Sequence, residues 1–452
     1  MIRSLLYKTG KRYTMKKKNL ITLLLVISIG ISNTYAQDWP QYLGPERNST
    51  SPQKGILRSW PENGPEVLWS VDVGIGYGGP VVKEGKAYLL DRNDEVGDDL
   101  RCFDLSTGKE LWNFEYEAPG EVMFPGSRSV PIVDDNHVYS CGPYGDLYCI
   151  DINTQKPVWN KNVWSDFGGG EIPRWAIAQC PLIYDDMLIL ASQAPEAGVV
   201  AYDKLTGDVK WKTPALGPVG YVSPVLVKVE GEDHVVMVTA SSGGRGTPET
   251  GGKVVGIDPL NGKILWEYDN WQCRIPAPSA FDAGDGKVLI IGGYRAGAAM
   301  VKVEKNAEGS YMVTELFKTV EFGAHTKPPI MHDGYFYAHY RTNERRDGLV
   351  CMNMNGEIMW KTKNKPDFNK GSMIVADGLI LATDGSKSLY LIEPNPSEFK
   401  PLAKSELLVE ELNPDASRAE RYGSQNWAPM ALSDGKLLIR DHNRMMCVKV
   451  AE

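Results

Sequence analysis

The sequence lacks the short motifs that mark many familiar active sites. It contains no phosphate-binding loop, no nucleotide fingerprint in a strand-to-helix context and no nucleophile elbow. No His-x-His pair or clustered Cys/His pattern occurs, although there are 6 histidines and 7 cysteines. The motifs therefore give no support for nucleotide chemistry or a serine hydrolase, and we predict no metal site.

Basic residues are not in excess either. The chain has 49 Lys and Arg against 57 Asp and Glu, a formal net charge of -8, and 42% hydrophobic residues. This balance excludes a basic tail that binds nucleic acid through phosphate contacts. With 46 glycines and 29 prolines, the composition is typical of a soluble protein rich in β-structure. The net charge therefore does not indicate a particular binding partner.

Long apolar runs are also scarce. The main one, Leu20–Ile31, is shorter than the ~20 residues that a membrane-spanning helix needs. Three lysines precede it and Thr34-Tyr35-Ala36 follows, which favours a cleaved secretory signal peptide over a membrane anchor. We therefore predict a signal peptide in residues 1–36 and one exported domain in residues 37–452, periplasmic or secreted and without a membrane span. If translation starts at Met15, the residues before it are an upstream extension.

The cysteines argue against a disulfide framework. Four of them occupy the same place in successive repeats: Cys102, Cys149, Cys351 and Cys447. Other copies have Ala201 or Gly256 there, so the position is a small buried strand site that suits a free thiol. A disulfide among Cys141, Cys180 and Cys273 stays open.

What the chain has in abundance is a repeat of about fifty residues. Each copy reads as a small residue and often proline, an apolar strand, a short polar turn and a second apolar strand. The eight copies begin at Gly78, Ser129, Ala178, Val222, Ala277, Lys327, Lys370 and Trp427. A repeat that continues to the last residues predicts one closed array rather than several domains.

A second signature follows the two-strand opening. Asp, then Thr-Gly or Asn-Gly, then Trp recur in the segments that begin at Asp104, Asp151, Asp203 and Asp258. This is hairpin chemistry, because glycine supplies a positive φ and the aspartate binds the local backbone. Four locally connected strands per repeat predict a propeller blade, with the tryptophan packed between neighbouring sheets.

The last copy stops without a fourth strand, while a spare strand lies near the other end at residues 65–73. Joining the two ends in one blade would remove exposed sheet edges. We therefore predict an all-β fold: an eight-bladed β-propeller of four-stranded antiparallel blades, with the N-terminal strand completing the last blade.

The Asp-x-x-Thr-Gly-x-x-x-Trp signature resembles that of the pyrroloquinoline quinone (PQQ) repeat propellers, the quinoprotein alcohol dehydrogenase-like family. The resemblance covers nearly all of residues 37–452 and implies the same fold. The family includes quinone-dependent alcohol dehydrogenases and outer-membrane assembly scaffolds, so it does not imply a single activity. Its dehydrogenases hold PQQ with Ca²⁺ and typically carry adjacent cysteines. No carboxylate-rich set or adjacent cysteine pair stands out here, so we predict no cofactor and do not favour PQQ with Ca²⁺.

In such a propeller, the loops entering the first strands and those joining the second to the third strands lie on one face. These loops hold Tyr77 and Lys370 and our candidate ligand-binding residues: Arg128, Arg174, Trp175, Tyr221, Arg274, Tyr294, Arg295, Lys327, Arg341, Trp427 and His442. Each residue alone could be merely solvated or packed. Together, in segments poor in Asp and Glu, they predict a funnel that binds anions and stacks on rings.

The scarcity of acids in these loops also restricts the chemistry. A glycosidase needs two facing carboxylates, and no such pair stands out. Elimination at a uronic acid instead needs cations on the carboxylate and a histidine or tyrosine as base and acid. We predict His325, His339 and Tyr340 as catalytic residues of a carbon–oxygen lyase or dehydratase, with an anionic saccharide as ligand.

Two other functions remain open on the sequence. One is a non-catalytic scaffold in the cell envelope with a protein partner, as in the outer-membrane assembly propellers. The other is a PQQ-dependent dehydrogenase of alcohols or sugars. Three histidines, His325, His339 and His442, could also converge across the funnel, but their spacing does not indicate a metal centre.

Overall fold

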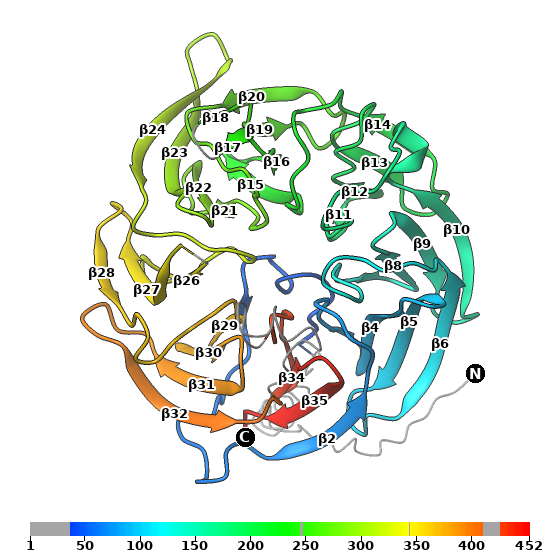
Figure 1. The fold of residues 1–452 in the computed structure, drawn as a ribbon, viewed down its shortest axis with the longest axis vertical. Coiled ribbons are helices and arrows are strands. Elements are labelled where there is room, and N and C mark those ends of the chain that lie inside the picture. The colour runs from blue at the N-terminus through cyan, green and yellow to red at the C-terminus, as the bar shows by residue number, and fades with distance from the viewer. Residues whose placement is uncertain (1–36, 245–246, 343, 410–424) are drawn as a thin grey trace, which may run out of the picture. The chain divides into compact units, whose positions relative to one another are not determined.

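The structure is a computed structural model that describes residues 37–244, 247–342, 344–409 and 425–452. The predicted signal peptide lies outside these residues. Ala36–Glu452 forms one compact unit, and its strands build eight blades arranged in a ring (Figure 1). No helix in the described ranges is long and apolar enough to cross a membrane.

The first four blades follow one another along the chain as antiparallel meanders, with one short 3₁₀ helix, η1 (Ser165–Phe167), after the second. Blade 1 contains β3 (Val81–Lys83), β4 (Lys86–Asn93), β5 (Gly97–Asp104) and β6 (Glu110–Glu117). Blade 2 contains β7 (Ile132–Asp134), β8 (His137–Cys141), β9 (Asp146–Asp151) and β10 (Lys156–Asn162). Blade 3 contains β11 (Leu182–Tyr184), β12 (Met187–Leu190), β13 (Val200–Asp203) and β14 (Val209–Lys212). Blade 4 contains β15 (Val225–Val229), β16 (Glu232–Val238), β19 (Val254–Ile257) and β20 (Ile264–Tyr268).

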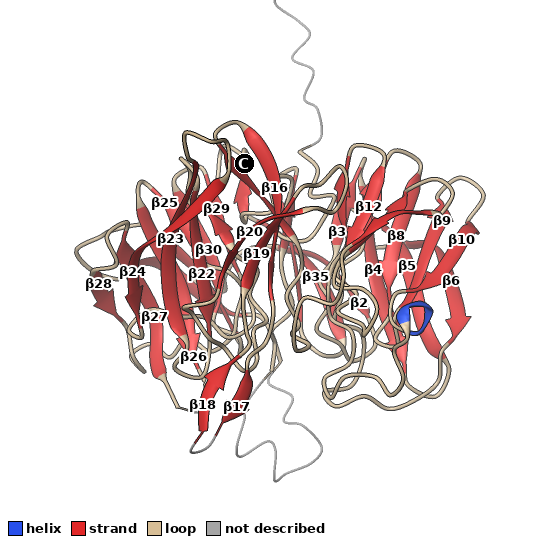
Figure 2. Cartoon of the chain, turned by 90° about the horizontal axis from the view of Figure 1, so that it is seen from above, coloured by secondary structure: helices blue, strands red, loops and turns tan. Residues whose placement is uncertain are grey.

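A two-stranded hairpin interrupts blade 4 between its second and third main strands. It consists of β17 (Ser242–Gly244) and β18 (Thr247–Thr250), which pair only with each other. Figure 2 shows this hairpin extending beyond the neighbouring strands of the blade.

The next three blades continue the ring. Blade 5 contains β21 (Phe281–Asp282), β22 (Lys287–Gly292), β23 (Gly297–Lys305) and β24 (Tyr311–Thr319). Blade 6 contains β25 (Ile330–His332), β26 (Tyr335–Arg341), β27 (Arg346–Asn353) and β28 (Ile358–Lys361). Blade 7 contains β29 (Met373–Ala376), β30 (Leu379–Thr383), β31 (Ser388–Glu393) and β32 (Lys400–Glu406), and the short β1 (Thr50–Ser51) pairs in parallel with β29.

Blade 8 joins the two ends of the described chain. It contains β33 (Ala431–Ser433), β34 (Lys436–Arg440), β35 (Arg444–Lys449) and, as its outer strand, β2 (Val67–Asp72). β2 runs antiparallel to β35, with Trp69 opposite Cys447 (Figure 1). The predicted closure of the ring by an N-terminal strand is confirmed, and so is the all-β, eight-bladed fold.

The turn signature works as a seam between blades. In blade 3, the Asp203 carboxylate accepts the backbone N–H groups of the turn, and Gly207 supplies a φ of 75°. Trp159 of blade 2 covers Gly207, where an added Cβ would lie 2.7 Å from the indole ring. The Trp159 indole also donates to the Lys204 carbonyl at 3.0 Å. Glycine is therefore required at this position for two reasons: the turn needs a positive φ, and the Trp159 ring leaves no room for a Cβ.

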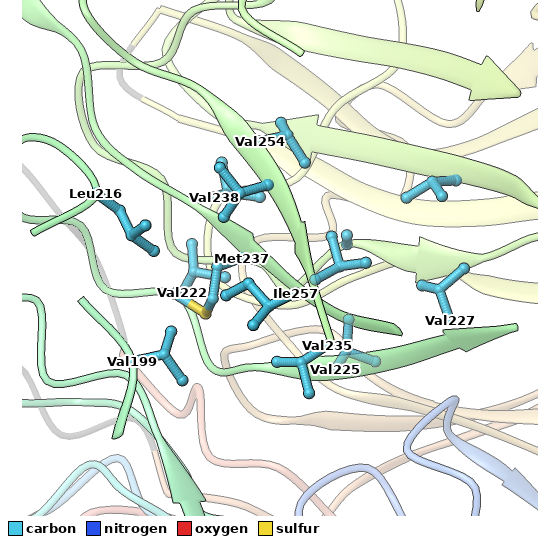
Figure 3. Close-up of a cluster of buried hydrophobic side chains, with 14 of the residues drawn as sticks. Val199, Leu216, Val222, Val225, Val227, Val235, Met237, Val238, Val254 and Ile257 are labelled. Atoms are coloured by element: carbon cyan, nitrogen blue, oxygen red, sulfur yellow. The ribbon is translucent and has the colours of Figure 1, made fainter. Parts of the chain in front are cut away.

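The interior consists of apolar layers between adjacent blades. In the layers flanking blade 4, Val227, Val235 and Ile257 are fully buried (Figure 3). Blade 5 lacks the signature tryptophan, and Phe317 takes its place against the turn glycine Gly356 of blade 6. All seven cysteines are buried and free, which answers the disulfide question left by the sequence.

An N-terminal plug, residues 39–51, crosses the inner side of the ring. Its backbone hydrogen bonds reach β3 of blade 1 and β7 of blade 2, and its last residues form β1 beside blade 7. Between them, the buried Arg47 guanidinium donates to the Pro181 carbonyl at 2.8 Å and the Pro224 carbonyl at 3.1 Å. The plug thus ties five blades together across the channel.

Candidate functional site

A cavity of about 530 Å³ lies where the inner loops of all eight blades meet. Seven blades present to it the residue four positions before their inner strand: Tyr77, Arg128, Ala178, Tyr221, Ala277, Thr326 and Trp427. Blade 7 contributes Lys370 instead, one position further along. Because the blades repeat, residues at nearly the same position before each inner strand line the cavity around the ring. Tyr42 of the plug completes the wall.

Aromatic side chains form two parts of this wall. On one side, the rings of Tyr77 and Trp427 lie 5.6 Å apart, and Phe124 lies 6.1 Å from Trp427. On another side, Trp175 and Tyr221 meet edge to face at 5.4 Å. Such surfaces are suited to stacking against the ring of a ligand.

The charged residues of the lining are all cationic. Arg128, Arg174, Lys327 and Lys370 line the cavity, and no Asp or Glu of the described residues lines it. The Arg128 guanidinium donates to the carbonyl groups of Trp175, Phe124 and Met123, and burial lowers its pKa to about 10. Arg174 lies over the Trp175 ring, 5.4 Å from its centroid. The cavity therefore attracts anions.

The two lysines are the most unusual of these groups. The Lys327 amine donates to the Trp427 and Lys370 carbonyls, the latter at 3.3 Å, and the Lys370 amine lies 3.9 Å from the centre of the Trp427 ring. Burial lowers the pKa of Lys327 to about 7. Burial, with added repulsion from Arg341 and Lys327, lowers the pKa of Lys370 to about 7. Among the described residues, neither amine is ion-paired with a carboxylate.

Behind the lysines lies a crevice of only about 10 Å³, enough for roughly one water molecule. His325, His339 and Ser49 of the plug form its walls together with both lysines. His325 Nδ1 and His339 Nε2 are buried without a hydrogen-bond partner in the described structure. Burial lowers the pKa of His325 well below its ordinary value and that of His339 to about 3, so both imidazoles are neutral at neutral pH.

The structure brings eight of the sequence-predicted site residues to the cavity: Arg128, Arg174, Trp175, Tyr221, Tyr294, His325, Lys327 and Trp427. His339 reaches only the crevice. His442 lies one layer back, with Nε2 3.2 Å from the Gln425 carbonyl and its ring against Tyr77.

Four predicted residues lie outside the lining. Arg274 and Arg295 are exposed, and Arg341 is ion-paired with Asp367. Tyr340 is fully buried in blade 6, where Arg345 lies over its ring at 5.3 Å. The loops joining the second and third strands reach the cavity less than we expected, because within their described parts Tyr294 is the one residue that lines it.

The sequence reasoning missed Tyr42, Met123 and Phe124, which line the cavity. Tyr42 belongs to the plug, which precedes the repeat. Comparison with the repeat copies therefore cannot predict its position. Met123 and Phe124 lie in the long connection between β6 and β7, and only the folded loop brings them inward. By contrast, the position four before each inner strand is a signal that aligning the eight copies would have supplied.

The donor set does not fit the Ca²⁺-held quinone that the resemblance implies. No described residue of the lining supplies a carboxylate for Ca²⁺, which prefers six or more oxygen ligands. In the described ranges, no group of three or more His, Cys, Asp or Glu side chains could hold a metal ion. Cys180 lines the cavity without an adjacent cysteine.

Fold and site together define an eight-bladed propeller with a cationic, aromatic-lined funnel. A family model described as outer membrane protein assembly factor BamB matches residues 96–362. This match spans more than half of the chain, so the protein belongs to this family of PQQ-repeat propellers. The family resemblance that the repeat indicated is confirmed.

Two curated relatives match shorter stretches. The quinoprotein alcohol dehydrogenase PedH of Pseudomonas putida is 30% identical over 154 residues, 32% of this chain and 24% of its own length. The quinoprotein ethanol dehydrogenase of Pseudomonas aeruginosa is 28% identical over 167 residues, 34% of this chain and 24% of its own length. The chain thus spans about a quarter of either relative in these matches.

Among solved structures, the quinohemoprotein alcohol dehydrogenase of Comamonas testosteroni superposes with a TM-score of 0.60. The superposition covers 92% of this chain and 81% of that one, at 12% sequence identity. At this identity the likeness concerns the fold alone.

Proposed function

We propose that the funnel binds an acidic saccharide and that the protein is an exported carbon–oxygen lyase acting on uronate residues. The observation that carries the proposal is the convergence of four cations and several aromatic rings on a cavity whose lining, in the described part of the chain, has no carboxylate. The cavity volume of about 530 Å³ suits one or two sugar rings. Cations would neutralise the uronate, and the rings would hold the sugar faces.

The chemistry would proceed by β-elimination. His325 is the base we favour, because it lines the cavity, has an unpartnered Nδ1 and is neutral at neutral pH. It would take the proton from the carbon next to the carboxylate, while the cations stabilise the enolate-like intermediate. The glycosidic carbon–oxygen bond then breaks, a carbon–carbon double bond forms, and the leaving oxygen takes a proton.

Tyr221 is the candidate for that final proton transfer. It lines the cavity, and burial raises its pKa, so its hydroxyl keeps its proton until the leaving oxygen develops charge. Tyr294 offers a second hydroxyl at the cavity, beside His325 with the two ring centres 4.6 Å apart. The reaction needs no oxidant, reductant or further reactant.

Incubation with a panel of uronate-containing polysaccharides tests the reaction, with the ultraviolet absorbance of the unsaturated product as readout. We expect product formation by the native protein and a loss of about a hundredfold or more in kcat with His325→Ala. A Lys156→Met variant, changed at an exposed residue of β10, is the control. No product from any member of the panel would contradict the lyase.

The family match favours a second candidate, a non-catalytic scaffold in the cell envelope, because the matching family model is named for an assembly factor. This function requires a stable protein partner whose binding is unaffected by His325→Ala. The curated relatives suggest a dehydrogenase, which would reduce a dye with an alcohol only after PQQ and Ca²⁺ are added. The carboxylate-free lining counts against that activity.

A further inference from the structure

We propose that Lys327, Lys370 and the crevice behind them form a carboxylate-binding subsite, which receives the acidic group of the ligand. The inference rests on the proposed binding of an acidic saccharide and assigns the place where its charge is held. It separates the funnel into an aromatic part that holds the ring and a subsite that holds the carboxylate. The subsite consists of His325, Lys327, His339 and Lys370.

The geometry of the four side chains supports a shared anionic ligand. Lys327 and Lys370 line both the open cavity and the crevice, so their amines lie at the boundary between the two. Within the described residues, Lys327 donates to two carbonyl groups, and the Lys370 amine lies over the face of an aromatic ring. Both amines therefore have donor capacity left for an anion at the boundary.

Among the described residues, no carboxylate lines the cavity or the crevice. Asp367, which lies on the same loop as Lys370, is ion-paired with Arg341. The charged groups that act on Lys370 are Arg341 and Lys327, and those that act on His325 and His339 are Lys370 and Lys327, all of them cationic. Burying like charges together is costly unless an opposite charge completes the set. A bound carboxylate would supply that charge.

The size of the crevice favours a carboxylate over a phosphate or sulfate. Its volume of about 10 Å³ admits one oxygen atom beside Lys327 and Lys370, the two cationic residues that line it. A planar carboxylate can place one oxygen there and turn the other toward the cavity. A tetrahedral anion presents further oxygens that the crevice cannot hold.

Binding at this subsite takes up protons near neutral pH and above. In the free protein, burial keeps the pKa values of Lys327 and Lys370 near 7, so at pH 8 the amines are largely neutral. A carboxylate between them raises both pKa values and draws protons from the solvent. Carboxylate affinity therefore falls as the pH rises above 7.

Isothermal titration calorimetry with galacturonate, and with galactose as the neutral control, tests the subsite. At pH 8 we expect the galacturonate binding enthalpy to depend on the ionisation enthalpy of the buffer, which shows proton uptake. We expect no such dependence for galactose. Lys370→Met and Lys327→Met should each weaken galacturonate binding by at least about tenfold, while Lys370→Arg and the matched Lys156→Met retain most of the affinity.

Circular dichroism of each variant establishes that it is folded before titration. Galacturonate binding without proton uptake, or with unchanged affinity in both lysine variants, would overturn the subsite. If proton-coupled binding is present but no polysaccharide is cleaved, the subsite stands and the lyase fails. If polysaccharide is cleaved with an unchanged KM in both lysine variants, the lyase stands and the subsite fails.

Discussion

Two of the regions in which the protein buries cations surround them in opposite ways. In blade 1, the fully buried Arg92 guanidinium is ion-paired with Asp94 at 2.7 Å and with Asp98 at 3.1 Å. At the funnel, the buried Lys370 and the partly buried Lys327 have no carboxylate beside them among the residues that the structure describes. We interpret a buried cation that has carboxylate partners as structural. Cations that lack such partners beside a cavity indicate a ligand-binding site.

The pKa shifts express the same contrast. Burial alone would lower the pKa of Arg92, but the carboxylates of Asp98 and Asp94 raise it on balance. Burial lowers the pKa of Lys370, and its charged neighbours Arg341 and Lys327 add to this effect instead of opposing it, so that the pKa is about 7. The first cluster is stable as it stands, and the second gains stability when an anion arrives.

The largest expected effect is on folding. Arg92→Met leaves Asp98 as an uncompensated buried carboxyl, and burial already raises the pKa of that group to about 6. We expect the variant to lose about 3–5 kcal/mol of the free energy of unfolding, measured by urea titration. The matched Lys156→Met should change it by less than about 0.5 kcal/mol. An equally small change for Arg92→Met would remove the distinction between the two clusters.

A smaller and opposite effect is expected at the funnel. Lys370→Met removes an uncompensated buried amine, so it should raise the stability of the ligand-free protein at pH 6 by about 1–3 kcal/mol. Between pH 7 and 10, the unfolded lysine binds more protons than the folded one, so native stability rises with pH relative to the variant. Urea titrations across this range measure the difference, and a variant less stable at pH 6 would contradict the account.

How far the sequence predicts this structure differs between scaffold and site. The eight strand pairs, the Asp-Gly-Trp seams and the closing strand follow from local periodicity, since each blade contacts only its neighbours. The lining follows only in part, as Arg128 and Trp427 face inward while Arg274 and Arg295 remain exposed. Loop conformation decides which of these side chains face the cavity. It does not follow the sequence repeat, so the periodicity cannot predict it.

The unpaired state of the lysines could not be predicted at all. The sequence places Asp367 three residues before Lys370, a spacing that equally allows an ion pair. In the folded protein, Asp367 is instead ion-paired with Arg341 of strand β26. Likewise, the plug comes before the repeat, so its contribution of Tyr42 to the cavity depends on tertiary contacts alone.

A third prediction concerns the aromatic part of the funnel. Trp427→Leu removes the ring beneath the Lys370 amine and opposite Tyr77. We expect it to weaken galacturonate and galactose binding alike, each by about five- to tenfold, because stacking does not depend on ligand charge. Calorimetric titration with both sugars measures this. A loss confined to galacturonate would show that the ring serves the carboxylate rather than the sugar.

The smallest expected effect is that of salt. A carboxylate held between buried amines is only weakly screened, so raising the ionic strength roughly tenfold should lower galacturonate affinity by less than about threefold. The same titration with Lys370→Met, in which the exposed Arg295 and Arg274 remain, provides the comparison. A steep salt dependence in the native protein would locate anion binding at the exposed rim.

The most direct test is a crystal structure of the protein with galacturonate. We predict a carboxylate within hydrogen-bonding distance of both Lys327 Nζ and Lys370 Nζ, with the sugar ring against Trp427. A carboxylate bound instead at Arg174 or on the exposed rim, with the two amines left as they are, would contradict the claim that the unpaired lysines mark the ligand site.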